Sequence, residues 1–334
     1  MPSLRVGIVG AGGETGGSIV NGLLEAGDFD VVALVRPASA SKPANTALKQ
    51  RGVEIRPIDL SGSQDAMVDA LKDLEVVISA VSAGEQLAQI PLATATKAAG
   101  VKRFLPCAFI TVIPPGGVQG LRDEKEHVYN HIKQLSLPYT IVDVGWWYQI
   151  SFPELPSGKI DYAIGFKGQT IAGDGNVPNA ITDLRDIGRY VAKIIVDDRT
   201  LNKYVFVYNE LWKPNDIYSL LEKLSGEKLE RKYTSRETFE AQIKDADEKM
   251  ANGATDFLTH VQKVTAQYLI SWGIRGDNTP EYAKYLGYLT SKDLYPDFNF
   301  KDYEEYIKEV LDGKAKGVYA ELRELQKQMS AAQK

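Results

Sequence analysis

The sequence predicts an α/β fold in which a doubly wound parallel sheet is covered by helices on both faces and is followed by a smaller mixed α/β part. Two observations support this prediction. Short apolar runs alternate with amphipathic helical patterns through the first 145 residues. These runs are continuously apolar rather than alternating, which is typical of strands buried on both faces.

The elements of this first part follow one another in a regular order. The expected strands are Leu4–Gly10, Val31–Val35, Val53–Ile58, Glu75–Val81, Arg103–Phe109 and Tyr139–Val144. The expected helices are Thr15–Ala26, Ala44–Arg51, Gln64–Leu71, Gln86–Ala99 and Asp123–Leu135. Right-handed crossovers between parallel strands then give the doubly wound order.

The rhythm changes after about Trp147, where Pro153, Pro156 and Gly158 interrupt the chain. Helical segments mix with short expected strands at Ile160–Ile164, Thr170–Ala172 and Tyr204–Tyr208. The apolar spacing of Asp186–Val196 predicts a helix that returns to the first part. We therefore expect one domain of residues 1–150, with residues 184–197 packed on it, and a second domain of residues 151–334.

The composition is typical of a soluble globular protein, with 44% hydrophobic and 25% charged residues among 334. The 39 basic residues against 44 acidic ones argue against nucleic-acid binding. No apolar run approaches the roughly 20 residues of a membrane span, and the N-terminus lacks the pattern of a signal peptide. We expect a cytoplasmic protein without membrane contact.

Cysteine and histidine give little sign of redox or metal chemistry. The single cysteine, Cys107, is interpreted as a small buried hydrophobe rather than a redox or nucleophilic group. His127 and His131 have i,i+4 spacing, but no HExxH pattern, cysteine pair or carboxylate cluster accompanies them. We favour solvent-facing helix residues and predict no metal site.

A glycine-rich turn follows the first expected strand and opens the first helix. It reads Gly10-Ala11-Gly12-Gly13-Glu14-Thr15-Gly16, with glycines three residues apart. Small residues there allow a tight turn and close approach of a pyrophosphate, and the helix N-terminus supplies unpaired N–H groups. The turn predicts a Rossmann-type dinucleotide site.

The residue after the second strand distinguishes the two common dinucleotides. NAD enzymes usually have an acid there, whereas this chain has Arg36, with Lys42 six residues further on. A guanidinium matches a 2′-phosphate, which an acid would repel. We therefore favour NADP(H) over NAD; the alternative is a solvated arginine at a strand end.

Several motifs together resemble the isoflavone reductase-like, or NmrA-like, branch of atypical short-chain dehydrogenases/reductases, including phenylcoumaran benzylic ether reductases. The resemblance extends from about Arg5 to Leu311. Its stretches are Leu34–Pro37, Val76–Val81 with Gln86 beyond it, Val101–Pro106, Leu137–Thr140, Gly173–Asn176, Asp186–Gly188, Asp198–Lys203 and Leu294–Asp297. The resemblance implies NADPH-dependent reduction and a C-terminal substrate-binding domain.

The family's catalytic lysine lies thirteen residues before the proline of its Pro-Tyr-Thr motif, which here gives Lys125 before Pro138. The tyrosine of the related Tyr-x-x-x-Lys pair would be Leu121, so that proton donor is absent. A second Tyr-x-x-x-Lys string, Tyr129–Lys133, leaves Lys133 as an alternative. The expected cofactor contacts are Gly10, Ala11, Gly12, Gly13, Glu14, Thr15, Gly16, Arg36, Lys42, Ser79, Ala80, Val81, Phe109 and Lys125.

The chain departs from the family pattern in three places. The family's Pro-Ser-Glu-Phe-Gly reads Pro106-Cys107-Ala108-Phe109-Ile110 here, which keeps the nicotinamide-side aromatic, Phe109, but replaces the serine and the glutamate. The family's second basic residue is Asn45, for which Lys42 is the expected substitute. Gly145–Tyr148 replaces a more polar stretch. These changes argue against simple transfer of the plant substrates.

Trp146, Trp147, Tyr148 and Phe152 follow the sixth strand, at the edge where open α/β sheets bind ligands. They are the expected substrate-binding residues, and a plug of interface core is the alternative. Thr111–Gly120 is a candidate mobile cover.

Two functions compete at this stage. The favoured one is an NADPH-dependent reductase that acts on an aromatic or conjugated small molecule, with Lys125 as general acid/base or electrostatic stabiliser. The alternative is an NADP(H)-sensing regulator without turnover. The sequence gives no preference between a monomer and a homodimer.

Overall fold

The computed structural model describes residues 3–254, 256–320 and 323. One long parallel sheet runs through it, in the order β3-β2-β1-β4-β5. A bridge between Phe104 and Tyr139 joins β5 to β6, and β6-β10-β13 continue the parallel order. These strands are β1 (Leu4–Val9), β2 (Phe29–Val35), β3 (Glu54–Pro57), β4 (Val76–Ser79), β5 (Arg103–Leu105), β6 (Thr140–Val144), β10 (Lys203–Val207) and β13 (Leu289–Thr290).

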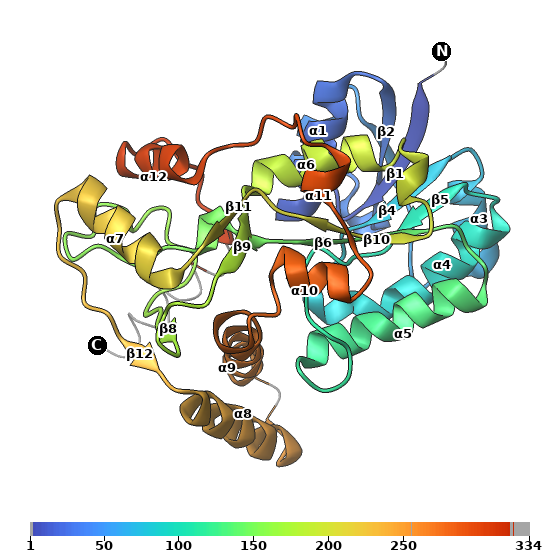
Figure 1. Ribbon diagram of the computed structural model, residues 1–334. Helices are drawn as coiled ribbons and strands as arrows, with labels where there is room; N and C mark the ends of the chain where they lie inside the picture. Colours follow the sequence, from blue (N-terminus) through green and yellow to red (C-terminus); the bar gives the residue numbers. More distant parts are fainter. Residues whose placement is uncertain (1–2, 255, 321–322, 324–334) are drawn as a thin grey trace.

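Helices cover both faces of the sheet, which confirms the predicted fold class (Figure 1). One face carries α1 (Glu14–Ala26) and α6 (Leu184–Ile194), and the other carries α3 (Gln64–Leu71), α4 (Gln89–Ala98) and α5 (Gly120–Gln134). At the α1–α6 contact a Cβ on Gly22 would collide with the backbone of Gly188. Glycine at both positions therefore lets the two helix backbones touch.

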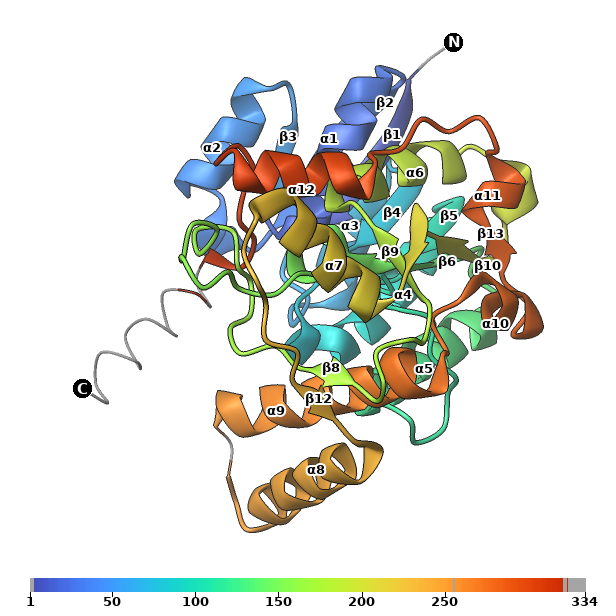
Figure 2. The same cartoon turned by 60° about the vertical axis from the view of Figure 1, so that its left-hand side comes forward.

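The C-terminal half contributes β10 and β13 to this sheet and otherwise forms short strands and helices. The other strands are β7 (Trp146–Trp147), β8 (Ile171–Ala172), β9 (Asn179–Thr182), β11 (Glu210–Trp212) and β12 (Tyr233–Thr234). The helices are α7 (Pro214–Ser225), α8 (Arg236–Ala251), α9 (Phe257–Tyr268), α10 (Pro280–Tyr285), α11 (Ser291–Leu294) and α12 (Tyr303–Leu311), with α2 (Pro43–Gln50) in the first half. Figure 2 shows α8 and α9 lying together at one end of the molecule.

Three expected elements differ in the structure. The predicted strand Ile160–Ile164 is wrong: Gly158, with φ +70°, begins successive turns, closed by hydrogen bonds such as Ala163 N to Ile160 O, 2.9 Å. Its two isoleucines pack in the C-terminal core and anchor these turns there, which is why an apolar run occurs without a strand. The fifth strand ends at Leu105 rather than Phe109, which has φ +47°. The helix expected from Gln86 begins as a 3₁₀ helix, η2 (Ala83–Ala88), before α4.

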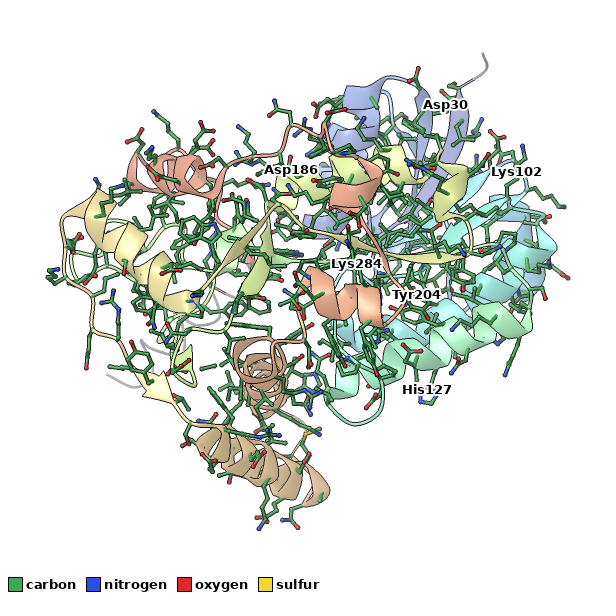
Figure 3. The ribbon with its side chains drawn as sticks, in the orientation of Figure 1. Asp30, Lys102, His127, Asp186, Tyr204 and Lys284 are labelled. Atoms are coloured by element: carbon green, nitrogen blue, oxygen red, sulfur yellow. The ribbon has the colours of Figure 1, made fainter. Side chains whose placement is uncertain are left out.

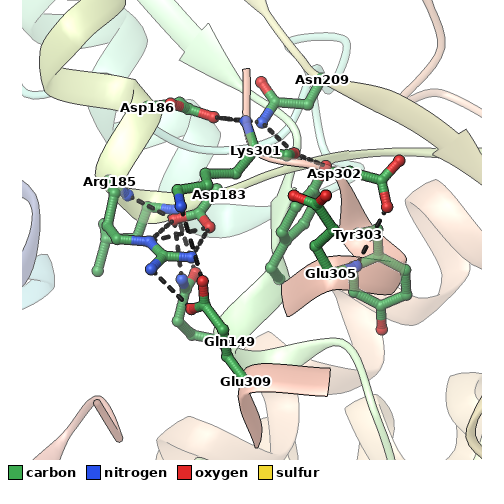
Figure 4. Close-up of polar contacts among 12 residues, drawn as sticks. Gln149, Asp183, Arg185, Asp186, Asn209, Lys301, Asp302, Tyr303, Glu305 and Glu309 are labelled. Carbon is green, nitrogen blue, oxygen red and sulfur yellow. Dashed lines mark hydrogen bonds and ion pairs between the residues drawn. The ribbon is translucent and has the colours of Figure 1, made fainter. Parts of the chain in front are cut away.

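A buried polar cluster ties α6 to the C-terminal elements (Figure 4). The carboxylate of Asp183 caps α6 by accepting from Arg185 N at 2.8 Å and also accepts from Gln149 Nε2 at 3.1 Å. Arg185 reaches across to Glu309 of α12, and Asp186 accepts from Lys301 N, 2.8 Å in each case. Buried charges held by several partners in this way fix the relative position of the elements that carry them.

The hydrophobic core divides into two clusters on the faces of the long sheet and a third among α7, α12 and the segment after β6. Within the described part of the chain, no helix is both long and apolar enough to cross a membrane. The division into domains at residue 150 stays a prediction, since the long sheet itself continues into β10 and β13.

Candidate functional site

The glycine-rich turn lies between β1 and α1, at the carboxyl edge of the sheet. Gly10 has φ +81°, and a Cβ there would collide with the carbonyl oxygen of Ala80. A Cβ on Gly16 would collide with Gly10 O in the same way. Gly12, in contrast, has no heavy atom within 4 Å of a Cβ position. Gly10 and Gly16 are thus required because the backbone of the turn packs too closely for a side chain. Gly12 instead borders open space.

This turn fits the phosphates of a dinucleotide. Gly13 is the N-cap of α1 and provides no side-chain hydrogen bond to the first turn. The N–H groups of that turn therefore remain available to an anion beside the open space at Gly12. The carboxylate of Glu14 is held by a different contact, in which its Oε1 accepts from the backbone N of Tyr319 at 3.0 Å.

Arg36 lies at the carboxyl end of β2, as expected, and its side chain is 74% exposed. Its nearest charge is Glu85 of η2, at 3.4 Å. Lys42 is exposed at the start of α2. Asn45 is buried, and its Nδ2 donates to Ser39 O at 2.6 Å, so the amide here holds the backbone of the loop. The two basic side chains near this loop are thus both solvent-accessible.

Ser79, Ala80 and Val81 extend from the end of β4 towards the glycine turn. Ala80 N donates to Val9 O at 2.8 Å, which joins the ends of β4 and β1. The hydroxyl of Ser79 is buried without a hydrogen-bond partner. Phe109 donates its backbone N to Val142 O at 2.8 Å and buries its ring in the core cluster shared with β1 and β6.

Lys125 is buried in the middle of α5, with 2% of its surface exposed. Its Nζ donates to the backbone oxygen of Cys107 at 2.6 Å and to Gln86 Oε1 at 2.8 Å. Burial lowers the pKa of this ammonium below its ordinary value. The alternative, Lys133, faces outward and donates to the hydroxyl of Tyr204 at 3.1 Å. Of the two lysines, only Lys125 is enclosed beside the loop that follows β5.

A second buried charge network lies on the same helix, and sequence reasoning missed it. Arg122 Nη1 donates to Asp143 Oδ2 at 2.8 Å, and the hydroxyl of Tyr288 donates to the same oxygen at 2.5 Å. Asp143 belongs to β6, so this network ties α5 to the sheet and to the residue that precedes β13. An acid inside the otherwise apolar strand Thr140–Val144 was the signal that could have revealed it.

The aromatic residues after β6 separate into two pairs. Tyr148 and Phe152 are fully buried in the C-terminal core, where the Tyr148 hydroxyl donates to Glu210 Oε1 at 2.8 Å. These two follow the interface-core alternative. Trp146 and Trp147 stay partly exposed at the carboxyl edge of the sheet. Of the four expected wall residues, the two tryptophans are therefore the ones that remain partly exposed.

Segments distant in sequence complete this aromatic wall. Tyr268 and Trp272 lie 5.4 and 5.6 Å from Trp146 between ring centroids. They come from the end of α9 and the π-helix Leu269–Arg275. Trp272 is buried, yet its indole N–H has no hydrogen-bond partner among the residues that the structure describes. Tyr319 stacks on Trp147 at 5.8 Å. Residues so far from β6 carried no motif that could link them to the site.

The histidines and the single cysteine show no sign of a metal or thiol site. Figure 3 shows His127 on the outer side of α5, where it is exposed, while His131 pairs with the hydroxyl of Thr94 at 2.8 Å. Cys107 is buried, and its thiol donates to Val81 O at 3.3 Å. In the described ranges no group of three or more histidine, cysteine or acidic residues could hold a metal ion.

A model of the NmrA-like family matches residues 2–307. The chain belongs to this family. This NmrA-like protein is 49% identical over 316 residues to asnovolin J 5′,6′-dehydrogenase of Aspergillus novofumigatus, covering 93% of this chain and 96% of that protein. It is 29% identical over 332 residues to bifunctional pinoresinol-lariciresinol reductase 1 of Thuja plicata, covering 91% and 97%.

Solved structures agree with the family assignment. The complex of leucoanthocyanidin reductase from Vitis vinifera with NADPH superposes with a TM-score of 0.76 at 26% identity, covering 92% of this NmrA-like protein and 99% of that chain. Isoflavone reductase superposes with a TM-score of 0.75 at 25% identity and the same coverage. The resemblance to the isoflavone reductase-like branch is therefore confirmed.

Proposed function

We propose that this NmrA-like protein is an NADP(H)-dependent oxidoreductase that acts on an aromatic or conjugated small molecule. The observation that carries the proposal is the placement of Lys125, a buried ammonium beside the loop after β5, within a fold that also presents an open glycine turn and an exposed Arg36. The names of the relatives support it, since they are a dehydrogenase and several reductases.

The chain's own residues divide the work of binding the cofactor. The first-turn N–H groups of α1 donate to the pyrophosphate, which lies in the space at Gly12. The exposed guanidinium of Arg36 donates to the 2′-phosphate, with Lys42 as a second cation from the start of α2. When bound, the nicotinamide accepts or supplies the hydride.

Lys125 acts on the oxygen of the substrate. Two of its three N–H groups donate to oxygens, and the third, whose partner is the sulfur of Cys107 at 3.9 Å, can exchange that long contact for an oxygen that gains negative charge. Because burial lowers its pKa, the same group can exchange a proton closer to neutral pH than an exposed lysine can. In the opposite direction, the neutral amine accepts a proton.

The aromatic wall supports the choice of substrate. Trp146, Tyr268 and Trp272 form a continuous set of rings, and a flat conjugated ligand can pack on such a surface. The unpaired N–H of Trp272 favours a ligand that carries a hydrogen-bond acceptor, since a buried donor without a partner is costly.

The test is a search for turnover in both directions. NADPH loss is followed at its nicotinamide absorbance with a panel of enones, imines and benzylic ethers, and NADP⁺ reduction is followed with their saturated counterparts. The proposal predicts turnover with at least one conjugated compound. Tight NADPH binding with no turnover across the panel would contradict it and would support the alternative, a regulator that senses NADP(H).

A further inference from the structure

We propose that Gln89 is a positioning residue that holds in place the two oxygen atoms that accept hydrogen bonds from the Lys125 ammonium. This inference rests on the proposed function, in which Lys125 acts on the substrate. The inference adds Gln89 of α4 to the site. Its side chain makes hydrogen bonds to Gln86 and to the backbone N of Cys107, the two residues to which Lys125 donates.

The first acceptor is the side chain of Gln86. Its Oε1 accepts from Lys125 Nζ at 2.8 Å and from Gln89 Nε2 at 3.1 Å. Its Nε2 donates to the backbone oxygen of Ser82 at 2.8 Å, which fixes the direction of the amide. Gln86 and Gln89 are both buried, so these bonds do not compete with bulk water.

The second acceptor is the backbone oxygen of Cys107, in the loop after β5. Gln89 Oε1 accepts from the backbone N of Cys107 at 2.7 Å. Gln89 Nε2 also donates to Gln86 O at 3.1 Å. One amide therefore joins the backbone of η2, the side chain of Gln86 and the loop of Cys107, and its two N–H groups and its oxygen are all used.

This arrangement determines in which direction the Lys125 ammonium can donate to a substrate. Two of its three donors are held by carbonyl oxygens at 2.6 and 2.8 Å, and the third makes only a long contact with Cys107 Sγ at 3.9 Å, which a substrate oxygen can replace. Both acceptors are neutral amides. The charged or titratable neighbours that influence Lys125 are the thiol of Cys107, Asp143 of β6, and Arg122 and Glu124 of α5.

Nuclear magnetic resonance of the full chain with NADP⁺ bound tests the proposal directly. Lysine labelled at Cε and Nζ is titrated with pH, and the Lys125 signal is assigned by its loss in Lys125→Arg. We expect the Lys125 midpoint to lie below those of the exposed lysines. In Gln86→Glu, which places a carboxylate at the 2.8 Å contact, the midpoint should rise.

The decisive variant is Gln89→Leu, with Gln134→Leu at the exposed end of α5 as its matched control. We expect Gln89→Leu to move the Lys125 midpoint and to lower kcat by about tenfold or more while the KM for NADPH changes little, because small displacements of a reacting group are costly. Gln89→Glu keeps the size and the acceptor for Cys107 N but loses the donor, and it serves where Gln89→Leu does not fold.

The outcomes separate this inference from the proposed function. If the Gln89 variants lose thermal stability but leave the Lys125 midpoint where the control has it, Gln89 is only structural and the inference is overturned. If the midpoint moves, the inference holds for the geometry of Lys125. Absence of turnover in the wild type, with a midpoint that still moves, would instead contradict the proposed function.

Discussion

Two cations, Arg36 and Lys125, are assigned to the same site but are held in opposite ways. Arg36 is 74% exposed and meets one carboxylate at 3.4 Å. Lys125 is 2% exposed and donates to two neutral oxygens at 2.6 and 2.8 Å. An exposed guanidinium costs little to keep charged and is free to bind a phosphate, whereas a buried ammonium carries a desolvation penalty. From this contrast we propose that Arg36 contributes cofactor affinity and that Lys125 contributes chemistry.

The largest effect should come from Lys125→Met, which keeps an unbranched side chain of nearly the same length and removes its charge. We expect kcat to fall between about 100-fold and about 10,000-fold, the usual contribution of a positioned acid or base. NADPH affinity should change much less. Single-turnover measurement of NADPH oxidation checks this, and an unchanged kcat would remove Lys125 from the chemistry.

Arg36→Glu should affect binding instead. Losing charge-assisted hydrogen bonds of about 1.5–3 kcal/mol predicts NADPH affinity weaker by about tenfold to about 100-fold, with NADH binding largely spared. Lys72→Glu, at the exposed C-cap of α3, makes the same change in net charge and is the control. Competition binding with both nucleotides measures the ratio. Equal losses for NADPH and NADH would break the assignment of Arg36 to the 2′-phosphate.

The buried position of Lys125 also predicts a pH-dependent stability. Its pKa in the folded state is lowered from 10.5, so the unfolded chain binds more protons between the folded value and 10.5. The free energy of unfolding should therefore rise with pH through this window, by at most about 1.4 kcal/mol per pH unit, relative to Lys125→Met. Denaturant unfolding of both proteins at several pH values measures the difference. Parallel curves would mean that Lys125 titrates alike in both states.

The smallest effect is expected for Glu85→Gln, which removes the carboxylate next to Arg36. Exposed ion pairs contribute up to about 1 kcal/mol, so NADPH binding should tighten by less than about fivefold and the gain should fade at high salt. Titration at low and high ionic strength distinguishes this from a structural change. Weaker binding would show that Glu85 orients Arg36 rather than competing for it.

Local motifs and regular strands could be predicted from the sequence, whereas contacts between segments far apart in the chain could not. The glycine turn and Arg36 are local to one strand–helix junction, and the parallel strands follow from apolar periodicity. The strand expected at Ile160–Ile164 failed because apolar residues that anchor turns look like a short buried strand. No local pattern marks Gln89 as a neighbour of the Lys125 acceptors, since the contact spans α4, α5 and the loop after β5.

The aromatic wall illustrates the same difference. Tyr148 and Trp146 are two residues apart, yet the first packs in the C-terminal core and the second at the edge of the sheet. Trp272 and Tyr319 reach the wall from segments more than 100 residues away in the chain. Which side of a turn a ring faces depends on these distant partners, and periodicity cannot reveal it.

Calorimetric titration of the purified chain with NADPH and with NADH tests the central claim most directly. The account predicts one NADPH bound per chain, at least about tenfold more tightly than NADH, because only NADPH offers the 2′-phosphate that a guanidinium binds. Absence of NADPH binding, or equal affinity for the two nucleotides, would contradict it.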